Sequence, residues 1–158
     1  MNKRNLVLVL LVVLCNSILL GQTTPDIPDL IRVTVDLSDN GVLIQWEPSA
    51  DTDIEFYNLY KMNQDLTFLR LFSFNASTLE YKHMTTGLKN LAYTVTAKDS
   101  SGNESLFGQN VHRAVQVLAE FDPIASANKV IWTAYEGWEG DISGYRLHGG
   151  LIGDTRMS

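Results

Sequence analysis

The chain has only one cysteine among its 158 residues, and this residue, Cys15, lies in an N-terminal apolar stretch. No intrachain disulfide is therefore available, and the rest of the chain offers no thiol for catalysis or metal binding. Apolar residues at i, i+3 and i+4 are also missing over helical lengths, which argues against helices. The longest apolar stretch, residues 6–20, has 15 residues and two polar interruptions. A transmembrane helix needs about 20 apolar residues.

Residues 1–21 are interpreted as a secretory signal peptide. Lys3 and Arg4 precede the apolar run 6–14, and cleavage is expected after Gly21. Two alternatives stay open: an uncleaved membrane anchor, and a lipid anchor on Cys15. The lipid anchor is disfavoured because leucine, rather than a small residue, precedes Cys15. We therefore expect an exported chain without a membrane span after signal removal.

The exported part is acidic. Without residues 1–21, ten basic and 18 acidic residues remain, which gives a net charge near −8. An acidic chain is a poor candidate for binding nucleic acid or anionic membranes. Neither is therefore expected as a partner.

What the exported part does contain is a series of short alternating segments separated by turns. Strands are expected at residues 31–37, 42–47, 56–61, 66–74, 78–83, 91–98 and 111–118. In the first, Ile31 and Val33 are expected to share a face, and Asn40-Gly41 is typical of a hairpin turn. Seven short strands predict an all-β fold, an antiparallel two-sheet sandwich.

Part of this pattern occurs twice. Trp46, Asp53-Ile54, Tyr57 and Leu59 recur as Trp132, Asp141-Ile142, Tyr145 and Leu147. The two tryptophans are 86 residues apart, about the size of one small sandwich domain. A tandem of such modules is typical of an extracellular array. We expect a first module at residues 22–112 and an incomplete second module at residues 113–158, because only 13 residues follow Tyr145.

Residues 25–112 resemble a fibronectin type III module. The resemblance is carried by VLIQWEPSADTDI at residues 42–54, by Tyr57-x-Leu59-Tyr60-Lys61, and by YTVTAKDSSGNES at residues 93–105. It implies an immunoglobulin-like β-sandwich with Trp46, Tyr57 and Tyr93 in its core. Tyr93 would be the corner tyrosine, whose hydroxyl bonds back to the backbone of the preceding turn.

The second module, FDPIASANKVIWTAYEGWEGDISGYRLHGG at residues 121–150, is similar to the second of paired modules in secreted surface proteins of gliding bacteria. Tyr135-x-x-Trp138 and Ile142-x-x-Tyr145 carry this similarity. It implies that Trp132 and Tyr145 are core residues, that the protein is secreted or on a bacterial cell surface, and that the chain is a fragment of a longer protein.

Tyr135 and Trp138 are the candidate interaction residues. They form an aromatic pair in a predicted loop, next to Glu136 and Glu139. An exposed pair of this kind could stack on a surface glycan or anchor a partner protein. The alternative is that Trp138 packs across the domain junction or onto the rest of the second module.

Metal and cofactor sites are not expected. Asp51, Asp53, Asp99, Asn103 and Glu104 fall in loops at one end of the predicted sandwich, but their spacing matches no ordered Ca²⁺ loop. Local turn bonds are the favoured role of Asp53 and Asp99. The histidines, His83, His112 and His148, are expected on separate strands without ligand spacing.

No catalytic residues are expected either, because the strong patterns are used for strands, turns and core. No serine lies in a Gly-x-Ser-x-Gly turn. The sequence therefore favours a secreted, non-catalytic protein for spacing and for protein or glycan contact. The alternative function is an accessory region of a secreted hydrolase whose catalytic domain lies beyond residue 158.

Overall fold

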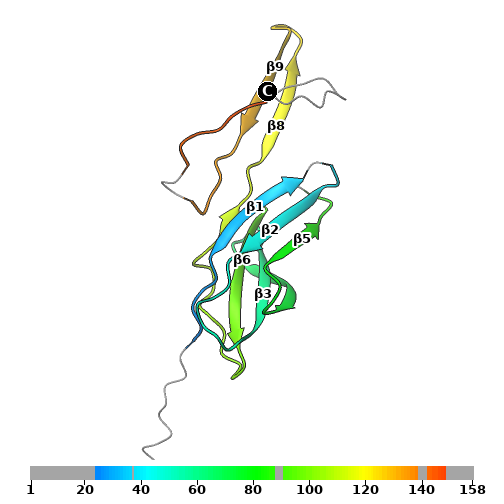
Figure 1. The fold of residues 1–158 in the computed structure, drawn as a ribbon. Coiled ribbons are helices and arrows are strands. Elements are labelled where there is room, and N and C mark those ends of the chain that lie inside the picture. Colours follow the sequence, from blue (N-terminus) through cyan, green and yellow to red (C-terminus); the bar gives the residue numbers. More distant parts are fainter. Residues whose placement is uncertain (1–23, 37, 88–90, 139–141, 149–158) are drawn as a thin grey trace, which may run out of the picture.

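The computed structural model describes residues 24–36, 38–87, 91–138 and 142–148 (Figure 1). Regular structure in these residues consists of β-strands alone. Within this part of the chain, no helix is long and apolar enough to cross a membrane. The predicted signal peptide lies outside the described residues.

Residues 24–116 form a sandwich of two antiparallel sheets. One sheet has the order β1-β2-β5, with β1 at Leu30–Asp36, β2 at Gly41–Trp46 and β5 at Glu80–Met84. The other has the order β4-β3-β6-β7, with β4 at Phe68–Asn75, β3 at Ile54–Met62, β6 at Ala92–Asp99 and β7 at His112–Arg113. The all-β, antiparallel two-sheet sandwich predicted from the alternating pattern is confirmed, and so is the immunoglobulin-like fold that the resemblance implies.

The core lies between these two sheets. Trp46, Tyr57 and Tyr93 are each 1% exposed or less, and they come from strands of both sheets. The ring of Trp46 meets Tyr57 edge-on at 6.0 Å and also contacts Phe74. Aromatic rings from both sheets thus pack together with aliphatic side chains in this core.

The prediction that Ile31 and Val33 share one face of β1 is wrong. A bulge between Leu30 and Arg32 shifts the register of β1 against β2. Leu30 is therefore 3% exposed and Val33 1%, whereas Ile31 is 41% exposed. One extra residue in a strand reverses which side chains point inward, and alternation alone does not reveal it.

The turn predicted at residues 38–41 lies between β1 and β2, and residues 38–40 form its described part. Asn40 has a φ of 58° and Gly41 is the first residue of β2. A Cβ at Gly41 would lie 2.3 Å from the side chain of Lys82, which bridges Asp36 and Asp39 at 2.8 and 2.6 Å. Glycine therefore permits the close approach of the Lys82 stem.

A separate two-stranded sheet follows the sandwich after a connection of three residues. It pairs β8 (Val117–Asp122) with β9 (Ala127–Trp132) and lies above the sandwich in Figure 1. Residues 142–148 have no regular structure. The described part of the predicted second module is thus a hairpin and two loop segments.

Apart from the bulge in β1, the β8–β9 hairpin has the register of the β1–β2 hairpin. Val117 pairs with Trp132 as Leu30 pairs with Trp46, and a loop of four residues closes each hairpin. The last loop residue, Asn40 or Ser126, has a φ of 58° or 48°.

The two loops also share a side-chain bond. Asp36 and Asp122, each at the end of the first strand, accept a hydrogen bond from the amide two residues on, at 3.0 and 2.8 Å. Such an Asx turn stabilises a tight change of direction without help from the rest of the fold.

Candidate functional site

The loop after β9 returns to the sandwich and forms the contact between hairpin and sandwich. We call residues 133–138 the junction loop; it includes both candidate interaction residues, Tyr135 and Trp138. Its docking partners are β1 and the short edge strand β7.

Tyr135 is the centre of this contact. Its hydroxyl oxygen accepts a hydrogen bond from the amide of Val33 at 2.9 Å and lies 2.8 Å from Nδ1 of His112. The single hydroxyl proton is then available for His112, provided the neutral imidazole has its own proton on Nε2. Burial raises the pKa of Tyr135 to about 12, although the bond from Val33 lowers it. The hydroxyl thus stays protonated at neutral pH and joins two strands of the sandwich.

Trp138 completes an aromatic cluster at the junction. It stacks on Tyr135 with ring centroids 4.6 Å apart and planes at 28°, and it meets His112 edge-on at 5.8 Å. Trp138 therefore packs across the junction, which was the alternative to an exposed interaction residue. With 37% of its surface exposed, it also keeps one accessible side.

Backbone pairing extends the four-stranded sheet into the junction loop. The amide of Arg113 donates to the carbonyl of Glu136 at 3.0 Å, and the amide of Glu136 donates back at 3.3 Å. The Arg113 guanidinium also lies 2.7 Å from the Glu136 carboxylate. Because Glu136 is more than half exposed, this ion pair contributes little compared with the backbone bonds.

Gly137 lets the loop lie on the His112 ring. Its φ is 115°, and a Cβ there would be 2.3 Å from Cδ2 of His112. Both the backbone conformation and the close approach exclude other residues without rearrangement. His112 itself is 2% exposed.

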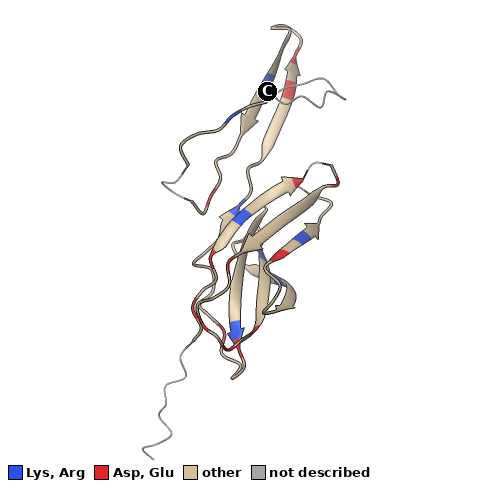
Figure 2. Cartoon of the chain, in the orientation of Figure 1, with Lys and Arg blue, Asp and Glu red and all other residues tan. Residues whose placement is uncertain are grey.

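A cleft of about 1100 Å³ separates β1 from the hairpin. Apolar side chains predominate in its lining: Val33, Thr34, Val35, Val115, Gln116, Val117, Leu118, Ala119, Ile131, Trp132, Thr133 and Tyr135. Figure 2 shows no charged residue along the lower half of either hairpin strand. The cleft is therefore an apolar surface between the two parts of the chain.

The predicted core role of Trp132 and Tyr145 is wrong for the described structure. Each of the two side chains is 42% exposed. Both still contact each other, with ring centroids 6.3 Å apart, and the Tyr145 hydroxyl accepts a 2.7 Å bond from the amide of Tyr135. They are exposed because no second sheet packs on the described hairpin.

A hydrogen bond equivalent to the one between the Tyr135 amide and the Tyr145 hydroxyl occurs in the sandwich. The Tyr57 hydroxyl accepts from the amide of Ser49 at 2.9 Å, and Ser49 follows Trp46 by three residues. Tyr135, the donor to Tyr145, likewise follows its tryptophan by three residues. Tyr57 is buried nevertheless, because both its neighbouring strands and the opposite sheet are in place.

The corner tyrosine, Tyr93, is fully buried and its hydroxyl lies 2.9 Å from Nδ1 of His83. Burial raises the pKa of the Tyr93 phenol and lowers the pKa of His83. The preceding turn, which includes residues 88–90, lies outside the described residues, so the expected bond to its backbone remains a prediction.

The acidic loops form the end of the sandwich away from the hairpin (Figure 2). Asp99 accepts bonds from the amide and the side chain of Asn103, both at 2.8 Å, and these bonds lower its pKa. Asp51 accepts from the amide of Asp26 at 2.7 Å. Among the described residues, no group of three His, Cys, Asp or Glu side chains is placed to hold a metal ion.

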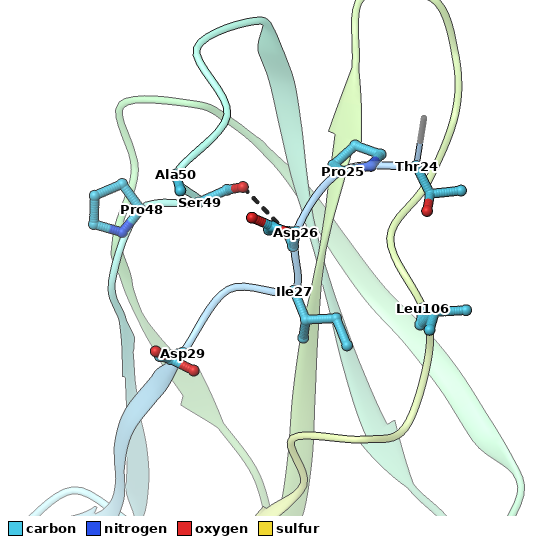
Figure 3. A pocket seen from close by; sticks show the side chains of 9 residues that line it. All are labelled: Thr24, Pro25, Asp26, Ile27, Asp29, Pro48, Ser49, Ala50 and Leu106. Carbon is cyan, nitrogen blue, oxygen red and sulfur yellow. Dashed lines mark hydrogen bonds between the residues drawn. The ribbon is translucent and has the colours of Figure 1, made fainter. Parts of the chain in front are cut away.

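A shallow pocket of about 460 Å³ lies at this same end, between the lead-in segment and the loop after β2 (Figure 3). The Ser49 hydroxyl donates to the carbonyl of Asp26 at 3.2 Å across it. Pro25, Ile27, Pro48 and Leu106 supply its apolar part. The contact anchors the lead-in segment to the sandwich.

Glu104 has a role that the sequence did not predict. Its carboxylate turns onto the four-stranded sheet and accepts hydrogen bonds from Asn58, Tyr60 and Thr96. Burial alone raises the pKa of Glu104, but these three bonds outweigh it and lower the pKa. Only the fold brings the three donors, from β3 and β6, to one oxygen.

Comparisons with known proteins add one likeness. No family model matches the chain, and no curated protein matches it. Among solved structures, the chain is similar to an Fn3-like protein from Clostridium thermocellum, with a TM-score of 0.44 and 20% sequence identity. The match covers 53% of this chain and 85% of that chain. The sandwich assignment does not depend on this likeness, because strand order and pairing establish it directly.

Proposed function

We propose that this chain is a secreted, non-catalytic spacer of the bacterial cell surface, built from tandem fibronectin type III-like modules. In this proposal the β8–β9 hairpin is the start of the second module. The shared register, loop length, Asx bond and tyrosine bond of the two hairpins support it.

The junction loop carries the functional part of the proposal. A spacer has to hold successive modules in a set direction, and a free linker would not do so. Here the connection between β7 and β8 has three residues, and Tyr135, Glu136 and Gly137 dock on the last strand of the sandwich. The loop therefore restricts rotation between the modules.

Distance measurements between the two parts test this proposal. Nitroxide labels on Ser101→Cys, in the loop after β6, and on Ala125→Cys, at the hairpin tip, would be placed in a Cys15→Ser chain. A single narrow distance distribution is expected, and Gly137→Ala should broaden it. A broad distribution in the chain without Gly137→Ala would contradict a spacer function.

Export and surface location need their own test. Expressed with its N-terminal residues in a bacterium, the chain should appear outside the cytoplasm with Gln22 as its first residue, as measured by mass spectrometry. Retention in the cytoplasm with residues 1–21 attached would contradict secretion.

Trp138 is the proposed contact for a surface glycan or a partner protein, because its ring is 37% exposed beside Tyr135. A surface polysaccharide should quench tryptophan emission in the unmodified chain and in Trp132→Phe, but not in Trp138→Phe. Equal quenching in all three would count against contact through Trp138.

A further inference from the structure

The outer face of the four-stranded sheet points away from the core of the sandwich. Successive residues of a strand point to opposite faces of the sheet. Since Tyr57 and Leu59 of β3 are buried in the core, their neighbours Phe56, Asn58 and Tyr60 lie on the outer face. This face is formed by the sandwich alone, so it does not depend on the second module.

A hydrogen-bond network holds the Glu104 carboxylate in the middle of this face. Its Oε1 atom accepts from the Asn58 amide group and the Tyr60 hydroxyl, both at 2.9 Å, and also from the Thr96 hydroxyl. The carbonyl oxygen of the Asn58 side chain accepts in turn from the Ser73 hydroxyl. Because Asn58 and Thr96 are each 2% exposed or less, the carboxylate is fixed before any ligand binds.

Two charged groups on this face have capacity for a ligand. The second oxygen of Glu104, Oε2, accepts no hydrogen bond from any described residue, and the side chain is only partly buried. Arg70 of β4 pairs directly with Tyr60 of β3, and directly paired residues share a face. Arg70 is exposed and forms no ion pair within the described part of the chain. An acceptor and a donor thus lie near the same tyrosine.

Aromatic rings lie beside these polar groups. Phe107, in the loop after β6, meets the ring of Tyr60 at 4.7 Å and the ring of Phe68 at 4.6 Å, both close to edge-on. These contacts hold the Phe107 ring on the sheet while 46% of its surface stays exposed. Phe56 is 36% exposed and lies four positions from Tyr60, about 13 Å along the strand. Exposed rings therefore lie on both sides of the network.

This combination suits a carbohydrate. A sugar ring has apolar C–H faces and a rim of hydroxyls that both donate and accept. Aromatic surface with a few fixed polar groups provides affinity and orientation for such a molecule. A protein partner that covered the face with apolar side chains would bury the Glu104 carboxylate and the Arg70 guanidinium without partners, which is costly. Because these two charges are opposite, the site favours a ligand without net charge.

We propose that the outer face of the four-stranded sheet binds a neutral, β-linked polysaccharide. One sugar ring stacks on Phe107, a sugar hydroxyl donates to Oε2 of Glu104, and Arg70 donates to a sugar oxygen. Glucose and xylose fit because their ring hydroxyls are all equatorial in β-linked chains, which leaves flat C–H faces. A second ring of the same chain stacks on Phe56, so longer oligomers bind more tightly. The proposal does not rest on the spacer function, and its site is distinct from Trp138.

Calorimetry and NMR on the full chain test the proposal. The probes are hexamers of β-1,4-linked glucose and of β-1,4-linked xylose, each compared with its dimer. At least one hexamer should bind saturably and more tightly than its dimer, and amide shifts should change in β3 and in the loop after β6. If neither hexamer binds, or if shifts change in the junction loop alone, the proposal is overturned.

A matched pair of variants locates the site. Phe107→Ala should weaken hexamer binding about tenfold, because it removes the stacking ring. Phe107→Leu keeps an apolar contact with the sheet but has no ring, so the same loss is expected. The control is Phe121→Ala on the hairpin, where the side chain is 65% exposed and binding should not change. Equal losses in Phe107→Ala and Phe121→Ala would overturn the placement.

The arginine has its own control. Arg70→Gln should weaken hexamer binding about fivefold, because it removes a charged donor. Arg32→Gln, on β1 of the other sheet, is also exposed and should leave binding unchanged. Full binding by Arg70→Gln would overturn the role of the guanidinium.

Trp138→Phe separates this site from the proposed contact at the junction. Hexamer binding should be unchanged in Trp138→Phe. Loss of binding in Trp138→Phe with full binding in Phe107→Ala would overturn the site on the sheet and leave the contact through Trp138 standing. Loss in Phe107→Ala together with a broad distance distribution between the labels at Ser101→Cys and Ala125→Cys would support the site and reject only the spacer.

Discussion

The two hairpins of this chain have the same local geometry and opposite burial. In β1–β2, Trp46 is 1% exposed, and in β8–β9 its counterpart Trp132 is 42% exposed. Both hairpins have the same tryptophan pairing, loop length and Asx bond. A second sheet packs on β1–β2, whereas no second sheet packs on the described β8–β9 hairpin. A hairpin therefore follows from local sequence, whereas a core needs a second sheet.

The largest expected difference concerns the two tryptophans. Trp46→Ala should lower the free energy of unfolding by about 3–5 kcal/mol, because it removes a large buried ring. Trp132→Ala should cost about 1 kcal/mol or less, because that ring is partly in solvent already. Urea unfolding measures both, and similar midpoint shifts in the two variants would contradict the comparison.

The junction can be broken at Gly137. Alanine there would combine a positive φ with a Cβ 2.3 Å from the His112 ring, at a cost of about 1–3 kcal/mol in docking. Hydrogen exchange should show loss of protection at the amides of Val33 and Arg113. The control is Gly144→Ala, where a Cβ meets nothing within 4 Å. Unchanged protection in Gly137→Ala would mean that the loop does not depend on this approach.

The Tyr135 hydroxyl provides a smaller and pH-dependent test. Tyr135→Phe leaves the Val33 amide without this acceptor and should weaken docking by about 1–2 kcal/mol at neutral pH. Because the folded pKa of Tyr135 is raised to about 12, docking favours the protonated phenol. Its contribution is therefore complete below pH 10, the ordinary pKa of tyrosine, and is lost as pH rises toward 12.

Phenolate absorbance measures that titration. One tyrosine should ionise near pH 12 in the unmodified chain and be missing from the titration of Tyr135→Phe. Docking in the variant should also lose its dependence on alkaline pH. An unmodified chain whose docking weakens below pH 10 would contradict this role of the hydroxyl.

The smallest expected effect on stability concerns Glu104, on the outer surface of the sandwich. This surface has no counterpart in the described hairpin. Since the folded pKa of Glu104 is lowered, its stabilisation is complete above the ordinary pKa of a glutamate and is lost as pH falls through the folded value. Glu104→Gln should cost about 1 kcal/mol at pH 7 and nothing once the carboxylate is protonated.

Urea midpoints between pH 7 and pH 2 check this, with exposed Glu55→Gln as the control. A constant difference between Glu104→Gln and the unmodified chain over that range would show that the charge of Glu104 contributes nothing.

Much of the sandwich was predictable because its strands alternate with a period of two. Val42, Ile44 and Trp46 face the core as the pattern indicates. The bulge that turned Ile31 outward was not predictable, because it depends on the pairing of β1 with β2. The site was predictable only in part: the pairing of Tyr135 with Trp138 is visible in the sequence, but His112 as their common partner is not.

The amino-acid sequence by itself determined most strands of the sandwich, its first hairpin turn and the positions of the paired tryptophans and tyrosines, because these follow from alternation and turn chemistry within a few residues. Only the tertiary structure decided which aromatic rings are buried, where the Tyr135 hydroxyl binds and which donors meet Glu104. Those outcomes depend on residues distant in the chain, such as Val33 and Tyr135, which are 102 positions apart. Their contact exists because packing brings β1 and the junction loop together, and no local pattern records it.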